Sequence, residues 1–220
     1  MKSFTLSLFI FCWTAISLFG QEKTIINDSW NIVGISVPVN DKLQLGLKPN
    51  MIRQNDYYKD YNRIFLDFTI KYKQSPQWSF QLLQRTVINN DANESIWFFF
   101  DVAHTHKETG HAFSIKNRLR FHFGTEALEN DLVGDFLRYE FSFHHPLGEK
   151  TKMYFALEPF YQFNQKNELQ RIRYELGLKR KLHPRWNLGL TMRREEAFPP
   201  TPNLGRNTIV SSLVYSFGKK

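Results

Sequence analysis

The sequence has almost no cysteine. Its one copy, Cys12, lies in the apolar run that follows Lys2, and this arrangement predicts a cleaved secretory signal over residues 1–20. The predicted mature chain, residues 21–220, then has no cysteine, which excludes disulfide bonds, a cysteine nucleophile and cysteine metal ligands. A retained membrane anchor is disfavoured, because the apolar run is short for a spanning helix of ~20 residues.

Long apolar runs are also absent after residue 20, so the mature chain is not expected to contain a transmembrane helix. It has no glycine-rich phosphate loop, no Walker-type lysine motif and no dinucleotide fingerprint, so no cofactor is implied. The formal charge of +8 is basic, but the basic residues are scattered at alternate positions rather than clustered. This scatter argues against a nucleic-acid partner.

What the chain does contain is alternation of apolar and polar residues with a period of two, which is typical of half-buried strands. The segment "HAFSIKNRLRFHFG" shows it most clearly, and roughly eleven such segments are visible, many near ten residues long. The others lie near residues 30–37, 43–53, 63–73, 78–88, 95–105, 136–145, 153–163, 171–181, 186–195 and 207–217.

The connections between these segments alternate between short turns such as "PVND" and longer polar loops such as "TEALENDLVG". This rhythm is typical of an all-β, up-and-down antiparallel transmembrane β-barrel with tight periplasmic turns. Bacterial barrels have an even strand number, so ten to twelve strands are expected. Twelve is favoured, with "EKTIIND" forming an extra strand before "WNIVGISV".

Alternation alone does not say which face is inside. A soluble barrel would bury the apolar face, whereas a membrane barrel turns it outward to lipid. The strand lengths, the export signal and the aromatic residues beside turns all favour the membrane barrel. These aromatic residues are Tyr72, Trp78, Trp186 and Phe217.

The membrane arrangement places the charged residues of the strands in the lumen, because an arginine facing lipid at mid-depth costs about 2–4 kcal/mol. We expect arginine–carboxylate ladders there. They either fill the lumen as a polar plug, which is favoured, or line a pore that selects anions. The predicted lumen network consists of Asp67, Arg118, Arg120, Arg138, Glu140, Glu158, Arg171, Arg173, Glu175 and Arg193, with Asp101 on the same faces.

Several of these stretches resemble an uncharacterised bacterial family, domain of unknown function 2490. The similarity lies in Trp30 at the start of a strand, in "RLRFHF", "RYEF" and "YFALEPFYQF", and in "RIRYELGLKRKLHPRWNLGLTMRRE". The resemblance covers most of the mature chain, residues 21–220. It implies an outer-membrane-type barrel and no assigned reaction, so it supplies no catalytic residues.

Glu140, Ser142 and His144 share one strand face and carry the residue types of a nucleophilic triad. Residues at i and i+2 lie ~7 Å apart along a strand, which is too far for a direct hydrogen bond. The sequence therefore predicts a polar cluster in the lumen and leans against an enzyme.

His104 and His106, with His111 beyond them, could share a metal ion. Histidines beside turns more often face solvent, so no metal site is expected. The last strand ends at Tyr215 and Phe217, an aromatic finish that resembles the sorting signal read by barrel-assembly machinery.

The function expected from the sequence is an outer-membrane barrel in contact with lipid, either structural or passing small solutes passively. A lipid-modifying barrel enzyme and a soluble exported barrel that binds an apolar ligand remain the alternatives.

Overall fold

The structure is a computed structural model that describes residues 24–55, 60–88, 95–107, 113–124, 135–163, 167–198 and 204–218. The predicted signal segment, residues 1–20, lies outside these ranges. The described residues form eleven β-strands. They are β1 (Thr24–Pro38), β2 (Leu43–Asn55), β3 (Asp60–Lys73), β4 (Trp78–Ile88), β5 (Ser95–Lys107), β6 (Ser114–Gly124), β7 (Phe136–Pro146), β8 (Thr151–Gln162), β9 (Glu168–His183), β10 (Trp186–Ala197) and β11 (Leu204–Ser216).

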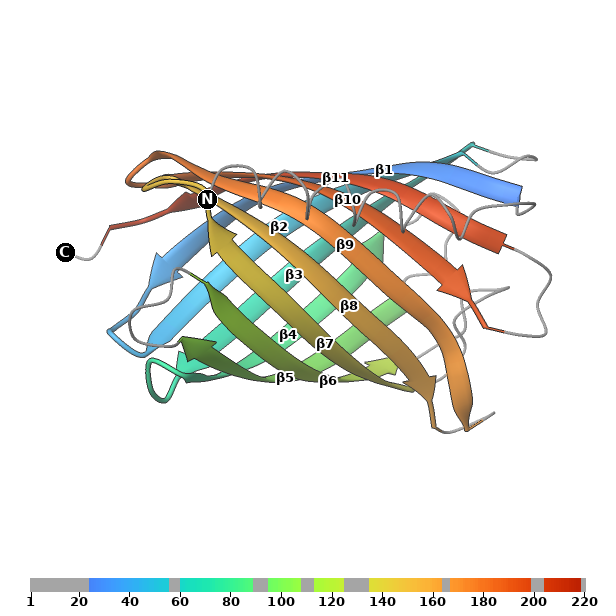
Figure 1. The fold of residues 1–220 in the computed structure, drawn as a ribbon, viewed down its shortest axis with the longest axis horizontal. Coiled ribbons are helices and arrows are strands. Elements are labelled where there is room, and N and C mark those ends of the chain that lie inside the picture. The colour runs from blue at the N-terminus through green and yellow to red at the C-terminus, as the bar shows by residue number, and fades with distance from the viewer. Residues whose placement is uncertain are drawn as a thin grey trace.

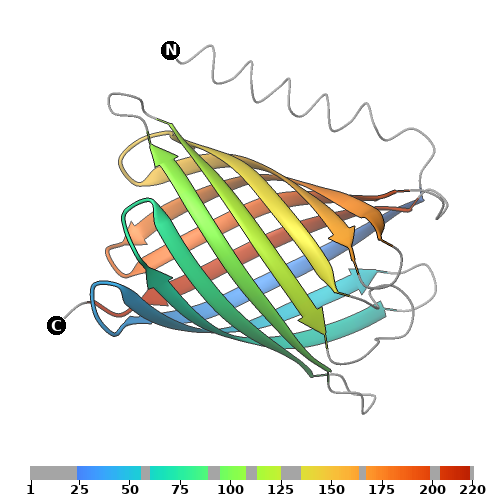
Figure 2. The same cartoon turned by 90° about the horizontal axis from the view of Figure 1, so that it is seen from below.

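Each strand pairs antiparallel with the next, and β1 closes the barrel against β11 (Figures 1 and 2). The all-β, up-and-down barrel predicted from the sequence is thus confirmed. The favoured count of twelve strands differs from the eleven described. The stretch from Thr24 to Asp28 is continuous with β1 and forms no separate strand.

The odd strand number fixes how the barrel closes. In an up-and-down sheet of eleven strands the first and last run in the same direction, so their pairing is parallel. Thirteen residue pairs, from Thr24–Leu204 to Ser36–Ser216, make up this seam. It differs from every other strand pair of the described barrel, all of which are antiparallel.

The two ends of the barrel differ. One end, called here the turn end, carries the tight connections 39–42, 74–77, 147–150 and 184–185 and lies on the left in Figures 1 and 2. Within the turn that follows β1, the side chain of Asn40 accepts hydrogen bonds from the backbone N–H groups of Lys42 and Leu43. The opposite end is called the loop end. The connecting segments there (56–59, 89–94, 125–134, 164–166 and 199–203) lie outside the described residues, and the predicted longer loops fall on them.

The strands are longer than expected, between 11 and 16 residues instead of near ten. Their tilt across the barrel explains this (Figure 1). A strand rises ~3.3 Å per residue, so about 13 residues at a tilt of ~45° cover the ~30 Å thickness of a bilayer core. No helix in the described ranges is long and apolar enough to cross a membrane.

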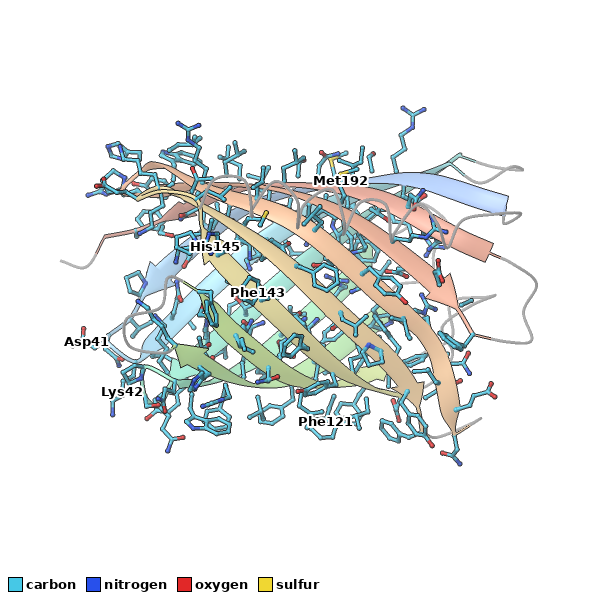
Figure 3. All side chains as sticks on the ribbon, viewed as in Figure 1. Asp41, Lys42, Phe121, Phe143, His145 and Met192 are labelled. Atoms are coloured by element: carbon cyan, nitrogen blue, oxygen red, sulfur yellow. The ribbon has the colours of Figure 1, made fainter. Side chains whose placement is uncertain are left out.

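The outer face of the barrel is apolar. Phe121 and Met192 point away from the interior (Figure 3), and the large side chains of Phe68, Phe141 and Leu190 are all exposed. The aromatic residues predicted to lie beside turns are exposed as well: Tyr72, Trp78, Trp186 and Phe217. The charged residues of the same strands alternate with these and point inward, which is the opposite of a soluble barrel.

Candidate functional site: the barrel interior

The barrel interior holds all ten residues of the network expected from the sequence. They lie on strands β3 and β6 to β10, and every one of them takes part in an ion pair. Strand register brings the partners together, because cross-strand neighbours on one face have Cβ atoms only ~5 Å apart. Arg120 is directly opposite Asp101, Arg118 is opposite Glu140, and Arg193 is opposite Glu175.

Glu158 on β8 is the centre of the largest cluster. Its side chain is only 3% exposed. It accepts hydrogen bonds from Arg138 at 2.9 Å, Arg173 at 2.9 Å and Arg118 at 3.2 Å. A buried carboxylate needs such partners, because leaving one unpaired costs several kcal/mol.

The cluster extends in both directions from Glu158. Arg118 also contacts Glu140 and lies 3.8 Å from Asp101, while Arg120 binds Asp101 with two hydrogen bonds of 2.5 and 2.6 Å. On the other side, Glu195 accepts from Arg173 at 2.8 Å and from Arg171 at 3.0 Å. We call these nine residues the charge cluster: Asp101, Arg118, Arg120, Arg138, Glu140, Glu158, Arg171, Arg173 and Glu195.

The network contains further partners that were not predicted from the sequence. Arg85 binds Asp67 through two hydrogen bonds of 2.7 and 2.8 Å, and Arg206 lies 3.2 Å from Asp28. Glu195, which joins Arg171 to Arg173, was also not identified. Glu195 stands two residues after Arg193 on the same face, so the register that identified Arg193 would have found it too. Arg85 shares its inward face with Leu83 and Val87, and β1 and β11 do not alternate cleanly, so the pattern did not single out Arg85, Asp28 or Arg206.

A group of aromatic residues, also not predicted from the sequence, points inward. Their rings form a continuous series of contacts with centroid distances between 4.4 and 6.5 Å. Leu83 and Val87 pack against it. We call this series the aromatic cluster: Trp30, Phe65, Trp97, Phe99, His122 and Phe136. The signal for it was an apolar residue on the polar face of a strand, as at Phe65 between Arg63 and Asp67.

Trp30 connects opposite walls of the barrel. Its ring lies 5.3 Å from the guanidinium of Arg85 on β4 and 4.8 Å from that of Arg193 on β10. Its indole N–H donates to Asn50 at 3.3 Å. Because strands β4 and β10 are separated by several strands in either direction around the barrel, Trp30 and the two arginines together form a chain of contacts across the interior.

Near the turn end, the interior surface differs from the parts of the barrel that hold the charge cluster and the aromatic cluster. Small residues line it, among them Gly34, Gly46 and Ala103. Larger side chains lie along the wall: the Lys48 stem covers Gly34, and the Tyr154 ring covers Gly177. Tyr154 is held in place by a 2.7 Å hydrogen bond to Thr191.

Several lysines take inward positions near the turn end. Lys73 and Lys152 are among them, close to the ends of β3 and β8. Four others are Lys48, Lys71, Lys116 and Lys179. Lys179 is exposed to solvent although it lies on an inward-facing strand position, and the other three are partly exposed. Water therefore reaches this mouth of the barrel. We call these four residues the lysine group.

The structure brings Glu140, Ser142 and His144 together, and here the sequence reasoning on distance was wrong. Ser142 Oγ lies 3.1 Å from His144 Nε2 and donates to Glu140 Oε1 at 3.3 Å. Side chains on one strand face can lean along the strand, so 7 Å between Cα atoms does not prevent contact. The arrangement is still not a triad: Glu140 contacts the serine instead of orienting the histidine, and Ser142 is 1% exposed.

His104 and His106 lie on the outer face of β5, where the ring of His104 packs at a tilt against that of Trp78, with a centroid distance of 4.6 Å. His111 lies outside the described residues. Among the described residues, no three His, Cys, Asp or Glu side chains come close enough to hold a metal ion. Tyr215 packs against Trp186 and Phe217, each at 4.9 Å, on the rim of the turn end.

Comparison with known proteins gives a family and a structural relative. Residues 27–203 match the family described as "Protein of unknown function (DUF2490)". Among solved structures, the chain is similar to the NanC porin in a rhombohedral crystal form, with a TM-score of 0.51 and 10% sequence identity. The match covers 79% of this chain and 86% of the porin chain. A search of curated proteins finds no match.

Proposed function

The chain belongs to the DUF2490 family, and from this premise we propose that it is a bacterial outer-membrane β-barrel, exported by a cleaved signal, that passes small solutes with a preference for anions. The observation that carries the proposal is the inverted distribution of residues. Apolar side chains cover the outside of the barrel and ion pairs fill its inside. In water this arrangement would expose a large apolar surface and bury charge, both at a cost.

The fold supports the proposal in two further ways. A closed sheet leaves no unpaired strand edge, which is a requirement for a β-structure in hydrocarbon. The exposed Tyr72, Trp78, Trp186 and Phe217 all lie near the turn end, as an aromatic girdle at one membrane interface would.

The ion pairs and Trp30 reduce the size of what can pass. With this chain of contacts across the interior, solutes cross only through the spaces between side chains, so passage is limited to small ions and molecules. The described interior charges that are not compensated are positive, which favours anions.

Membrane fractionation tests the location. The mature chain should stay with the outer-membrane fraction after a carbonate wash, and on gels it should migrate differently before and after boiling. A chain that is released by carbonate, or that stays soluble without detergent, would contradict the proposal and support the soluble barrel.

Planar bilayers test the passage. The refolded protein should give small single-channel conductances, and a salt gradient should give a reversal potential of the sign for anion selectivity. A barrel that is correctly inserted but shows no conductance above background would be a structural barrel with a closed plug.

A further inference from the structure

We propose that the lysine group (Lys48, Lys71, Lys116 and Lys179) forms a binding site for a small multivalent anion bearing carboxylate or phosphate groups, inside the turn-side mouth of the barrel. The inference deepens the proposed function and rests on it, because it names the solute class that the barrel would admit.

The four lysines face one another across the interior. Lys48 and Lys71 come from the neighbouring strands β2 and β3, whereas Lys116 on β6 and Lys179 on β9 come from other parts of the barrel wall. Lys71 is within electrostatic range of Lys48 and Lys179, and Lys116 is within range of Lys71 and Lys179. Like charges held this close repel one another, and a bound anion would relieve that repulsion.

The nearby carboxylates do not neutralise these lysines, because arginines already bind them. Asp67, directly opposite Lys48 in the register of β2 and β3, is paired with Arg85. Asp101, which is within electrostatic range of Lys71, is paired with Arg120. Of the four lysines of the lysine group, only Lys116 makes a salt bridge within the described residues, a long one of 4.0 Å to Glu140.

Counting charges leads to the same conclusion. The interior ion pairs of the described strands use eight arginines (Arg85, Arg118, Arg120, Arg138, Arg171, Arg173, Arg193 and Arg206) and seven carboxylates (Asp28, Asp67, Asp101, Glu140, Glu158, Glu175 and Glu195). The arginines are thus nearly balanced, and they act as a plug. The surplus positive charge is that of the inward lysines near the turn end, which include the lysine group.

The surroundings of the lysine group also fit a polar ligand. The wall behind it is small and hydrophilic, with Ser36, Gly46 and Ser142, and Lys179 lies over the face of Tyr154 at 4.5 Å. Solvent exposure of Lys179 shows that a soluble anion can reach the site from the turn end. Several ammonium groups around one point suit an anion with two or more charges better than chloride.

The test is calorimetric titration of citrate, a multivalent carboxylate, into the refolded full-length mature protein in a neutral detergent at low ionic strength. The variant is Lys71→Gln/Lys179→Gln, which removes two ammonium groups that make no salt bridge. The control is Lys42→Gln/Lys150→Gln, which removes the same charge from exposed positions in turns 39–42 and 147–150. The gel shift on boiling verifies that all three proteins are folded.

We expect wild type to bind citrate with an affinity that falls as salt is added. The Lys71→Gln/Lys179→Gln variant should bind at least about tenfold more weakly, and the control should stay within about twofold of wild type. The site is refuted if wild type binds no citrate, if the variant binds like wild type, or if the control loses as much affinity as the variant.

Binding and conductance separate this inference from the proposed function. Citrate binding by a folded barrel that does not conduct would leave the site standing and remove the passage. Conductance without citrate binding would refute the site and leave the proposed passage standing.

Discussion

The charge cluster and the aromatic cluster fill neighbouring parts of the same barrel interior by different means. The charge cluster, on β5 to β10, contains shared carboxylates such as Glu158, which three arginines bind. The aromatic cluster, on β1, β3 and β5 to β7, packs around one bidentate pair, Arg85–Asp67. The guanidinium of Arg85, on β4, lies over the rings of Trp30, Phe65 and Phe99.

The two regions of the interior depend on different interactions. In the charge cluster Glu158, Arg118 and Arg173 are each shared among several partners, so removing one of them leaves buried charges without partners. In the aromatic cluster each ring packs against its neighbours without compensating a charge. The loss of one ring therefore mainly leaves a cavity. A mutation in the charge cluster should therefore affect several residues together, whereas a mutation in the aromatic cluster should have a local effect.

The largest effect is expected for Glu158→Gln, which takes the shared carboxylate from three arginines. We expect a loss of about 3–5 kcal/mol in the free energy of unfolding, the usual cost of breaking a buried ion pair. Urea unfolding of the refolded barrel in lipid vesicles measures it. The matched control is Glu149→Gln in the exposed turn 147–150, which should change stability by less than about 0.5 kcal/mol. A loss under about 1 kcal/mol for Glu158→Gln would show that the cluster is not cooperative.

The next effect is expected for Trp30→Ala, which removes the ring between Arg85 and Arg193. Stability should fall by about 2–4 kcal/mol, and single-channel conductance should rise because the cross-section opens. Trp78→Ala on the outer face is the control, and its conductance should match wild type. Equal conductance for Trp30→Ala and wild type would mean that Trp30 does not restrict passage.

Double-mutant cycles sharpen the comparison between the two regions. The cycle of Arg120 with Asp101 lies in the charge cluster, and that of Arg85 with Asp67 lies among aromatic rings. Each pair should show a coupling energy of about 1–3 kcal/mol, and the Arg120 cycle should change when Arg118, which is also close to Asp101, is replaced. If neither coupling energy changes when a neighbouring residue is replaced, the two regions do not differ in cooperativity.

The smallest effect is expected for Ser142→Ala. The buried hydroxyl contributes hydrogen bonds to Glu140 and His144, so a loss of about 0.5–1.5 kcal/mol should follow. We also expect no phospholipid hydrolysis by purified wild type, because the serine faces the interior and not the lipid. Hydrolysis by wild type that disappears in Ser142→Ala would overturn this and revive the lipid-modifying enzyme.

Much of the fold followed from the period of two, because inward and outward positions alternate along every strand. That rule assigned Arg118, Arg120 and Glu140 to the interior, where the structure places them. It failed to find Trp30 and Phe65, since an aromatic residue on the polar face looks like an irregularity in the pattern. The strand count was also out of reach, because nothing in the alternation distinguishes an added strand from the extended start of β1.

The candidate site was predictable only in part for a related reason. Alternation tells which way Lys71 and Lys179 point, but their strands are not neighbours, and only the closed barrel brings them face to face. In the same way, sequence spacing suggested that Ser142 and His144 could not touch, because side-chain lean along a strand is set by packing and not by spacing.

The parallel seam has a consequence for how the barrel is made. Every other strand pair joins consecutive strands, whereas Asn31 and Ser211, hydrogen-bonded across the seam, are 180 residues apart. Such a distant pairing has to wait until the whole set of hairpins exists. Until then the sheet has two open edges, and hydrocarbon does not tolerate unpaired backbone groups. For a barrel that resides in the outer membrane, as proposed above, the unfinished sheet would have to be chaperoned outside the bilayer, or its edges would have to rest on another protein until the first strand meets the last.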